Sequence, residues 1–158
     1  MKRLAAVLAF TLSLSVQAAE LQDGIQAFAA GDYDTAQQIF RERSDAGDAR
    51  GAFWIGYLYH YGHGVKVDQV EALKWFQQSA DRGDVKARQY LGIMYQKGQG
   101  APQDLVAAHK WYTLFHRDTD NVRDRPYTRE IVKKMERKMT PEQIAQAKQM
   151  ADSWEPAN

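Results

Sequence analysis

The chain of 158 residues contains no cysteine, so it forms no disulfide and has no thiolate nucleophile. It also lacks an excess of charge of either sign, because 21 lysines and arginines stand against 20 aspartates and glutamates. This balance gives no indication of nucleic acid or of a strongly charged surface as a partner. With 44% hydrophobic residues, the chain has enough apolar content for one packed domain of ordinary size.

The common motifs of catalysis are absent as well. The sequence has no His-Glu-x-x-His, no Gly-x-Ser-x-Gly and no phosphate-binding loop. The Gly-x-Gly runs at 62–64 and 98–100 resemble half of a dinucleotide fingerprint, but they lack a third glycine and a preceding strand. We interpret both runs as turns that end helices. We therefore predict a protein that is not an enzyme and that needs no cofactor.

The histidines leave one alternative open. His60 and His63 lie close together at the end of a predicted helix, and with a carboxylate such as Asp68 they would supply metal ligands. Two histidines at a turn are more often surface residues, so we predict no metal site. His109 and His116 belong to one helix and have no companion carboxylate at metal-ligand spacing, so we interpret them as structural.

Residues 1–18 have the pattern of a secretory signal peptide. Two basic residues precede an apolar stretch from Leu4 to Val16, and Ala18 provides a small residue at the cleavage site. The alternatives are a membrane anchor or a core helix, but a span needs about 20 apolar residues, more than this stretch provides. No cysteine follows the stretch to accept a lipid. We expect a periplasmic or secreted protein, cleaved near Ala18 and without a membrane anchor.

The strongest pattern in the chain is an internal repeat with a period of 36 residues. The recurring residues include Asp32, Ala36, Phe40, Asp45, Gly56, Tyr59, Gly62 and Gly64, which reappear as Asp68, Ala72, Phe76, Asp81, Gly92, Tyr95, Gly98 and Gly100. A third copy begins at Asp104 with the same spacing. We interpret each unit as a helix, a tight turn, a second helix and a glycine-rich turn.

The second unit shows how the two helices are expected to pack, because each carries an apolar stripe at helical spacing. The first stripe consists of Ala72, Trp75, Phe76 and Ala80, and the second of Ala87, Leu91, Gly92 and Tyr95. Gly83 can adopt the left-handed conformation that ends the first helix, and Asp84 can cap the second. Gly92 costs about 1 kcal/mol of helix propensity. In return we expect the close approach of a bulky residue such as Trp75.

These units resemble the Sel-one-like repeat (SLR) family, an α/α solenoid related to the tetratricopeptide repeat. The family pattern is Ala-x-x-Trp-Phe/Tyr, then Gly-Asp, then Ala-x-x-x-Leu-Gly-x-x-Tyr-x-x-Gly-x-Gly, and residues 72–100 meet it nearly in full. The first unit departs from it with Ile39 at the tryptophan position and Gly51 at the alanine position. The resemblance implies an all-α fold, a short right-handed α/α solenoid of antiparallel helix pairs with a 36-residue period.

The segments that flank the repeats have the pattern of capping helices, which cover the ends of a solenoid. Before the first unit, a short helix that ends at Gly31 carries the stripe Leu21, Ile25, Phe28 and Ala29. In the third unit Pro126 can begin a degenerate second helix, with Tyr127, Ile131, Met135 and Met139 at four-residue spacing. The sequence Thr-Pro-Glu-Gln at 140–143 predicts the start of a last helix, with Ile144, Ala147, Ala151 and Trp154 as its packing face.

The pattern therefore divides the chain into six segments. They are a signal peptide at 1–18, an N-terminal capping helix at 19–31, repeat 1 at 32–67, repeat 2 at 68–103, a degenerate repeat 3 at 104–139 and a C-terminal capping helix at 140–154. The polar surface of the last part includes Lys133, Lys134, Glu136, Arg137 and Lys138. We interpret this cluster as a solvated cap in preference to a nucleic-acid site.

Two groups of residues are candidates for binding a partner. Six side chains lie off the apolar stripes at the repeat spacing and would form two columns: Gln38, Lys74 and Lys110 in one, and Arg41, Gln77 and Thr113 in the other. The family resemblance implies that the first helices line the concave surface where peptides bind, although a merely solvated face is the alternative. Trp54, Tyr57 and Tyr61 also lie off the main stripe, which suits either protein recognition or packing on the next unit.

We accordingly expect a non-catalytic periplasmic or secreted interaction module that binds a protein or peptide of the cell envelope on its concave face. The alternative is an envelope enzyme acting on cell-wall or β-lactam substrates, since some cysteine-rich relatives are described as β-lactamases or penicillin binders. Those relatives carry paired cysteines in their repeats, and this chain has none. A third possibility, a secreted effector or enzyme inhibitor, would use the same surface in another compartment.

Overall fold

The computed structural model describes residues 20–120 and 124–157, and all regular structure in these residues is helical. Residues 20–29 are helical, and seven further helices follow: α2 (Tyr33–Asp45), α3 (Ala49–Tyr61), α4 (Gln69–Asp81), α5 (Val85–Lys97), α6 (Leu105–Asp118), α7 (Asp124–Glu136) and α8 (Pro141–Asp152). None of the helices in the described ranges is long and apolar enough to cross a membrane. The predicted signal peptide lies outside the described residues.

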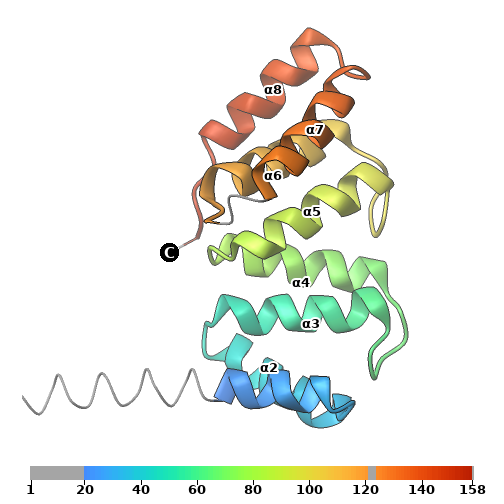
Figure 1. The fold of residues 1–158 in the computed structure, drawn as a ribbon, viewed down its shortest axis with the longest axis vertical. Coiled ribbons are helices and arrows are strands. Elements are labelled where there is room, and N and C mark those ends of the chain that lie inside the picture. Colours follow the sequence, from blue (N-terminus) through green and yellow to red (C-terminus); the bar gives the residue numbers. More distant parts are fainter. Residues whose placement is uncertain (1–19, 121–123, 158) are drawn as a thin grey trace, which may run out of the picture.

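Consecutive helices stack on one another into a solenoid (Figure 1). From α2 to α6 each helix packs against the next, and α6 also contacts both α7 and α8. After α8 the chain turns back along the stack, where the backbone N–H of Ala157 donates to the carbonyl of Asp81 at the end of α4 (2.5 Å). The predicted all-α class and solenoid arrangement are confirmed.

Aspartates start the helices at the repeat spacing. Asp32, Asp68 and Asp104 are the N-caps of α2, α4 and α6, where their carboxylates accept hydrogen bonds from backbone N–H groups of the first turn. Asp84 caps α5 in the same way, as predicted. Gly98 ends α5 with a φ of 70°, a left-handed conformation that glycine adopts without a steric penalty. The helix boundaries therefore follow from local chemistry that recurs every 36 residues.

Gly92 does allow a close approach, but the predicted neighbour was wrong. A Cβ at Gly92 would lie 3.0 Å from ring atoms of Tyr112, not beside Trp75. The reason is that Gly92 faces α6, the helix that follows it, whereas Trp75 packs against the cluster formed by α2 and α3. The equivalent Gly56 faces Phe76 of α4, with Cβ to ring distances from 2.9 Å.

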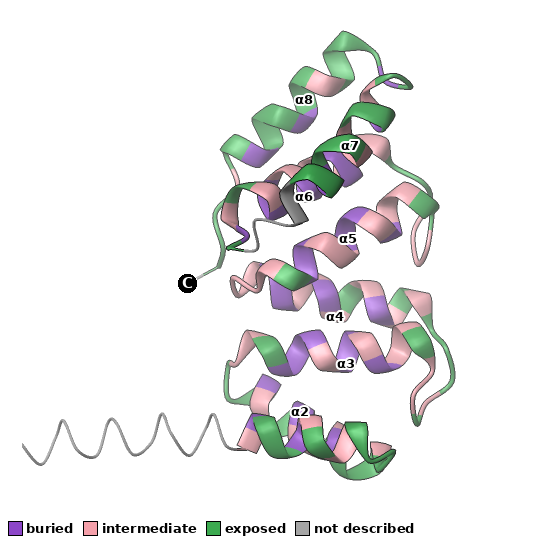
Figure 2. Ribbon diagram, in the orientation of Figure 1, coloured by how far each residue is buried: buried purple, intermediate pink, exposed green. Residues whose placement is uncertain are grey.

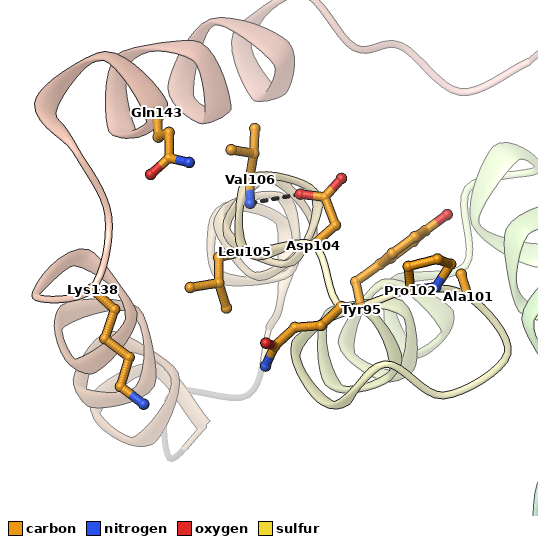
Figure 3. A pocket seen from close by; sticks show the side chains of 9 residues that line it. Tyr95, Ala101, Pro102, Asp104, Leu105, Val106, Lys138 and Gln143 are labelled. Atoms are coloured by element: carbon orange, nitrogen blue, oxygen red, sulfur yellow. Dashed lines mark hydrogen bonds between the residues drawn. The ribbon is translucent and has the colours of Figure 1, made fainter.

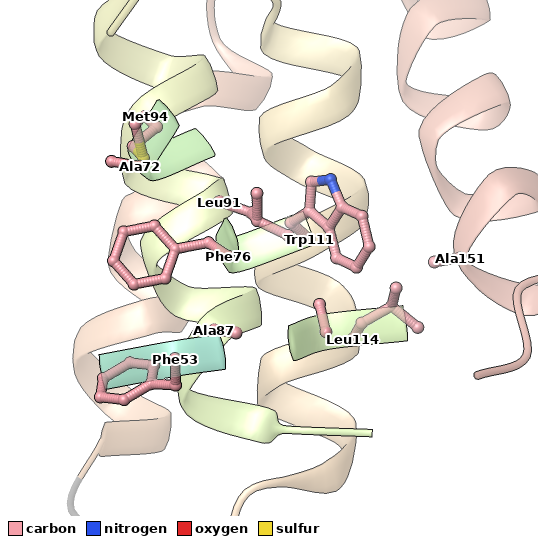
Figure 4. Packing of buried hydrophobic residues seen from close by; sticks show 10 residues of the cluster. Phe53, Ala72, Phe76, Ala87, Leu91, Met94, Trp111, Leu114 and Ala151 are labelled. Atoms are coloured by element: carbon pink, nitrogen blue, oxygen red, sulfur yellow. The ribbon is translucent and has the colours of Figure 1, made fainter. Parts of the chain in front are cut away.

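Among the described residues, the core runs through the stack as three clusters of buried side chains. In the central one Leu91 lies between the rings of Phe76 and Trp111 (Figure 4). Buried residues are concentrated along α3, α4, α5 and α6, while α8 at the end is mostly exposed (Figure 2). The predicted stripes of α4 and α5 are buried, except that Trp75 and Tyr95 are only partly so.

The two ends depart in detail from the predicted pattern. Helix α7 begins at Asp124, so Pro126 is its third residue, still within the first turn where no helical N–H bond is lost. Tyr127 is 66% exposed and does not join the core. Ala29 is also exposed, although Leu21 of the same predicted stripe is buried. Met139 and Trp154 pack against neighbouring helices from positions beyond the ends of α7 and α8.

Candidate protein-interaction surfaces

The predicted columns lie on α2, α4 and α6. Some residues of each column form hydrogen bonds within the helix to which they belong. Gln38, Arg41 and Lys74 are exposed, whereas Gln77, Lys110 and Thr113 are half-buried. Each of the polar residues Gln38, Lys74 and Gln77 donates to a carboxylate of its own helix, namely Glu42 (3.0 Å), Glu71 (2.6 Å) and Asp81 (2.8 Å).

The remaining column residues contact aromatic rings or a histidine. Arg41 lies 6.0 Å above the ring of Trp75, and Lys110 lies 4.3 Å above the ring of Trp111. Partial burial lowers the pKa of Lys110. Trp154 also lies 6.0 Å from the Lys110 ammonium, so the segment after α8 covers part of this column. The columns form a polar surface interrupted by the chain's own C-terminal segment, and their role in binding stays a prediction.

A second surface is a groove along α3 and α5, which sequence reasoning identified only through its aromatic residues. It consists of two adjoining cavities of about 550 and 380 Å³ that share Phe53, Trp54, Val85 and Lys86. The larger cavity also includes Tyr57, Gln89, Tyr90, Phe115, Asp118, Thr119 and Asp120, and the smaller includes Leu21, Gln22, Ile25, Arg50 and Asp84. We call this surface the α3–α5 groove.

The aromatic side chains of the α3–α5 groove both pack and face the opening. Trp54 stacks on Phe40 at 5.3 Å, and Tyr90 stacks on Phe76 at 4.7 Å, while Trp54, Tyr57 and Tyr90 all remain half-buried. Desolvation raises the pKa of both Tyr57 and Tyr90. Both alternatives weighed for Trp54 and Tyr57, recognition and packing, are therefore compatible with their positions. Beside the groove Tyr61 is 49% exposed.

Charged side chains border these rings. Lys86 is exposed and forms no ion pair with any residue that the structure describes. Asp118 is paired with buried Arg88 and with Arg117. Burial raises the pKa of Asp84, the N-cap of α5, against the opposing effect of its hydrogen bond from the Ala87 N–H. The groove thus combines an apolar aromatic wall with a cation, Lys86, that lines both cavities.

The two histidines that the sequence offered as metal ligands lie in an aromatic environment. His60 and His63 lie among aromatic rings, with His63 stacked on Tyr57 at 5.9 Å. Partial burial lowers the pKa of His60. Within the described ranges no three histidines, aspartates or glutamates come together as a metal-binding group.

His109 has a carboxylate neighbour that the spacing of the sequence did not reveal. Its Nε2 lies 3.0 Å from Oε1 of Glu136 in α7, and its Nδ1 lies 3.2 Å from the hydroxyl of Thr113. His109 is only 1% exposed and Thr113 is one turn away on the same helix, so the chain of hydrogen bonds ties α6 to α7. The contact escaped sequence reasoning because its partners are 27 residues apart in a unit that departs from the repeat.

A sequence model of the Sel1 repeat family matches residues 49–84 and 85–115. Residues 49–115 thus match as two consecutive Sel1 repeats. The resemblance seen in the sequence is thereby confirmed. The two matched repeats begin with α3 and α5, so these are the first helices of the units that the family model defines. The predicted columns lie on α2, α4 and α6, which do not begin these units.

Two solved structures support the Sel1-repeat assignment. The structure of c5321, a protective antigen of uropathogenic Escherichia coli with an SLR fold, superposes with a TM-score of 0.76 at 26% identity, over 85% of this chain and 29% of that one. A Sel1 repeat protein from Oxalobacter formigenes superposes with a TM-score of 0.58 at 31% identity, over 61% and 40%. The chain therefore spans less than half the length of either relative. Comparison with curated proteins gives no match.

Proposed function

We propose that this Sel1-repeat protein is a non-catalytic interaction module that binds a protein or peptide of the cell envelope. Sel1 repeats generally mediate protein–protein interaction. The observation that carries the proposal for this chain is the α3–α5 groove. In the same proposal the module acts in the periplasm or outside the cell, after cleavage near Ala18.

The α3–α5 groove has the composition of a protein-binding surface. Partly exposed Trp and Tyr side chains supply much of the binding energy in protein interfaces, because they bury a large area and still offer a polar tip. Here Trp54, Tyr57 and Tyr90 are held by packing against the buried rings of Phe40, Phe53 and Phe76, so little side-chain entropy is lost when a partner covers them. Lys86 would pair with an acidic or carbonyl group of that partner.

The surface formed by the predicted columns is the alternative binding face to the α3–α5 groove. A pull-down from envelope extract compares the wild type with two variants, Lys86→Glu/Gln89→Glu in the groove and Arg41→Glu/Lys74→Glu/Lys110→Glu in the columns. Circular dichroism establishes that both variants are folded. We expect a partner that the wild type and the column variant retain and the groove variant loses.

The other outcomes are equally decisive. Loss with the column variant alone would move the binding face to α2, α4 and α6 and would overturn the groove. Capture of no partner by the wild type would argue against an envelope interaction module. Localisation is tested separately by N-terminal sequencing of the exported protein, for which we expect Ala19 as the first residue.

A further inference from the structure

Two further adjoining cavities, of about 500 and 450 Å³, open where the start of α6 meets the end of α5 and the end of α7. They share Gln103, Leu105 and Lys138. We call the second of them the lysine cavity, and it is lined by Gln96, Lys97, Gln103, Leu105, Lys134, Met135 and Lys138. Figure 3 shows Leu105 of α6 directed into the space that Lys138 borders.

Three of the residues lining the lysine cavity are cations and none is an acid. Lys97 comes from α5, Lys134 from α7 and Lys138 from the segment after α7. All three are exposed, and none forms an ion pair within residues 20–120 or 124–157. Three like charges around one recess create a positive potential that attracts an anionic group. Lys133 of α7, by contrast, lies 4.0 Å from Glu130 on its own helix. Lysines in this part of the chain can therefore have a carboxylate partner.

The floor of the lysine cavity is apolar and held in place. Met135 is 2% exposed and Leu105 is half-buried. Gln103 donates through Nε2 to the carbonyl of Gln96 (2.7 Å), and the Oε1 of Gln96 accepts from the hydroxyl of Tyr112 (3.1 Å). These hydrogen bonds hold the side chains of Gln96 and Gln103 in place, and none of them involves a lysine.

The neighbouring cavity extends the apolar wall through Pro102 and Val106. Its single carboxylate belongs to Asp104, which accepts from the N–H groups of Val106 (2.9 Å) and Ala107 (3.0 Å) as the N-cap of α6 (Figure 3). That carboxylate does not line the lysine cavity, and within the described residues it forms no ion pair with Lys97, Lys134 or Lys138. The two cavities together offer an extended channel with cations along one side.

We propose that the lysine cavity binds an acidic peptide segment of a partner protein, with its carboxylates on Lys97, Lys134 and Lys138 and an apolar side chain on Leu105 and Met135. A free phosphate would leave the apolar floor uncovered. A flat bilayer surface would not reach into a recess between helices. This proposal rests on the proposed function, since its ligand is a segment of a partner protein. The lysine cavity shares no residue with the α3–α5 groove, so failure of peptide binding at this cavity would leave the groove standing.

Fluorescence anisotropy with a labelled Glu-Glu-Leu-Glu-Glu peptide tests this site in the purified protein. The cavity variant is Lys97→Glu/Lys134→Glu/Lys138→Glu. The matched control is Arg129→Glu/Lys133→Glu/Arg137→Glu, which makes the same change in net charge at cations that do not line the lysine cavity. We expect the wild type and the control to bind alike, and the cavity variant to bind at least about tenfold more weakly, as loss of charge complementarity predicts.

A second readout locates the peptide. With ¹³C-labelled methionine methyl groups, the NMR signal of Met135 should shift on titration, whereas that of exposed Met150 on α8 should not. Equal weakening by both variants, equal binding of a Gln-Gln-Leu-Gln-Gln peptide, or an unmoved Met135 signal would each overturn the proposal. Binding of inorganic phosphate or phosphatidylglycerol vesicles that exceeds binding of the peptide would overturn it in favour of another anion.

Discussion

Gly92 of α5 lies directly against the aromatic ring of Tyr112 in α6, so close that a Cβ at this position would meet three ring carbons at 3.0 Å. The same contact occurs one repeat earlier between Gly56 and Phe76. In both places a helical residue without a side chain lets the next helix approach. At both places the distance between consecutive helices therefore depends on a glycine and on the aromatic ring that it faces.

Replacing Gly92 by alanine tests that dependence. The methyl group would force the buried Tyr112 ring to move, at an overpacking cost of typically 1–3 kcal/mol, while alanine would recover only about 1 kcal/mol of helix propensity. We expect Gly92→Ala to lower the free energy of unfolding by about 1 kcal/mol, measured by urea denaturation. In a Tyr112→Leu background the same substitution should lose most of its cost. An equal cost in both backgrounds would show that the ring is not responsible.

Glu136 should make the free energy of unfolding decrease as the pH becomes acidic. The hydrogen bond with His109, assisted by Lys148 at 3.7 Å, holds the pKa of Glu136 below its ordinary value. A carboxyl group whose folded pKa is lowered contributes stability above its unfolded pKa of about 4.5 and loses it as the pH falls through the folded value. We expect Glu136→Gln to be less stable than the wild type at pH 7 and to approach it at pH 3.

Urea unfolding at several pH values measures this difference. Glu130→Gln is the control on the same helix, since Glu130 is exposed and its ion-pair partner Lys133 is 4.0 Å away. A Glu136→Gln curve parallel to that of the wild type over the acid range would contradict the prediction.

Asp84 should have the opposite dependence on pH. Its pKa is raised, chiefly because burial disfavours the charged carboxylate. Stability from such a group is present below its unfolded pKa and is lost as the pH rises through the folded one. Asparagine keeps the acceptor for the Ala87 N–H and removes the buried charge. We therefore expect Asp84→Asn to raise the melting temperature at pH 7, with no gain at pH 3; a lower melting temperature at pH 7 would contradict this.

Trp154 should stabilise the end of the stack although it lies beyond the last helix. Its ring contacts Trp111 edge to face at 5.6 Å, and the guanidinium carbon of Arg88 lies 4.6 Å from the ring centre. We expect Trp154→Ala to cost about 2 kcal/mol in thermal or urea unfolding, less than for a fully buried tryptophan. Trp154→Phe should recover much of the loss. Wild-type stability of the alanine variant would show that the segment after α8 is not docked in solution.

The alternative of a β-lactam-hydrolysing enzyme has a direct test. The hydrogen-bonded chain from Thr113 through His109 to Glu136 places a hydroxyl, an imidazole and a carboxylate in series. However, His109 is buried, so its ring is closed to substrate and solvent. We expect purified protein to leave nitrocefin unhydrolysed. Turnover abolished by Thr113→Ala would reverse this conclusion.

The sequence predicted those parts of the fold that depend on neighbours along the chain. The caps at Asp84 and Asp104 involve residues within one turn, and the stripes of α4 and α5 need only helical periodicity. The partner of Gly92 was missed because it depends on which adjacent helix the glycine faces. The start of α7 was displaced because the third unit no longer follows the repeat.

The candidate surfaces could be predicted only in part, for the same reason. Trp54 and Tyr57 stood out because they are aromatic residues that lie off the main apolar stripe of their own helix. Lys86, by contrast, joins them only when α3 and α5 are packed. The lysine cavity combines Lys97 with Lys134 across α6, which no local pattern reveals.

The repetition of the aspartate caps bears on how such a chain can change length. Removing residues 69–104 would join Asp68 to Leu105, and Asp68 would then cap α6 as Asp104 does now. Gly56 would meet the ring of Tyr112 in place of Phe76, and His60 would take the position of Gln96 near the tyrosine hydroxyl. Gene duplication or loss of one whole unit would thus preserve the helix starts and interhelix spacing of those that remain, so stacks of different length can descend from one ancestor without rebuilding their core.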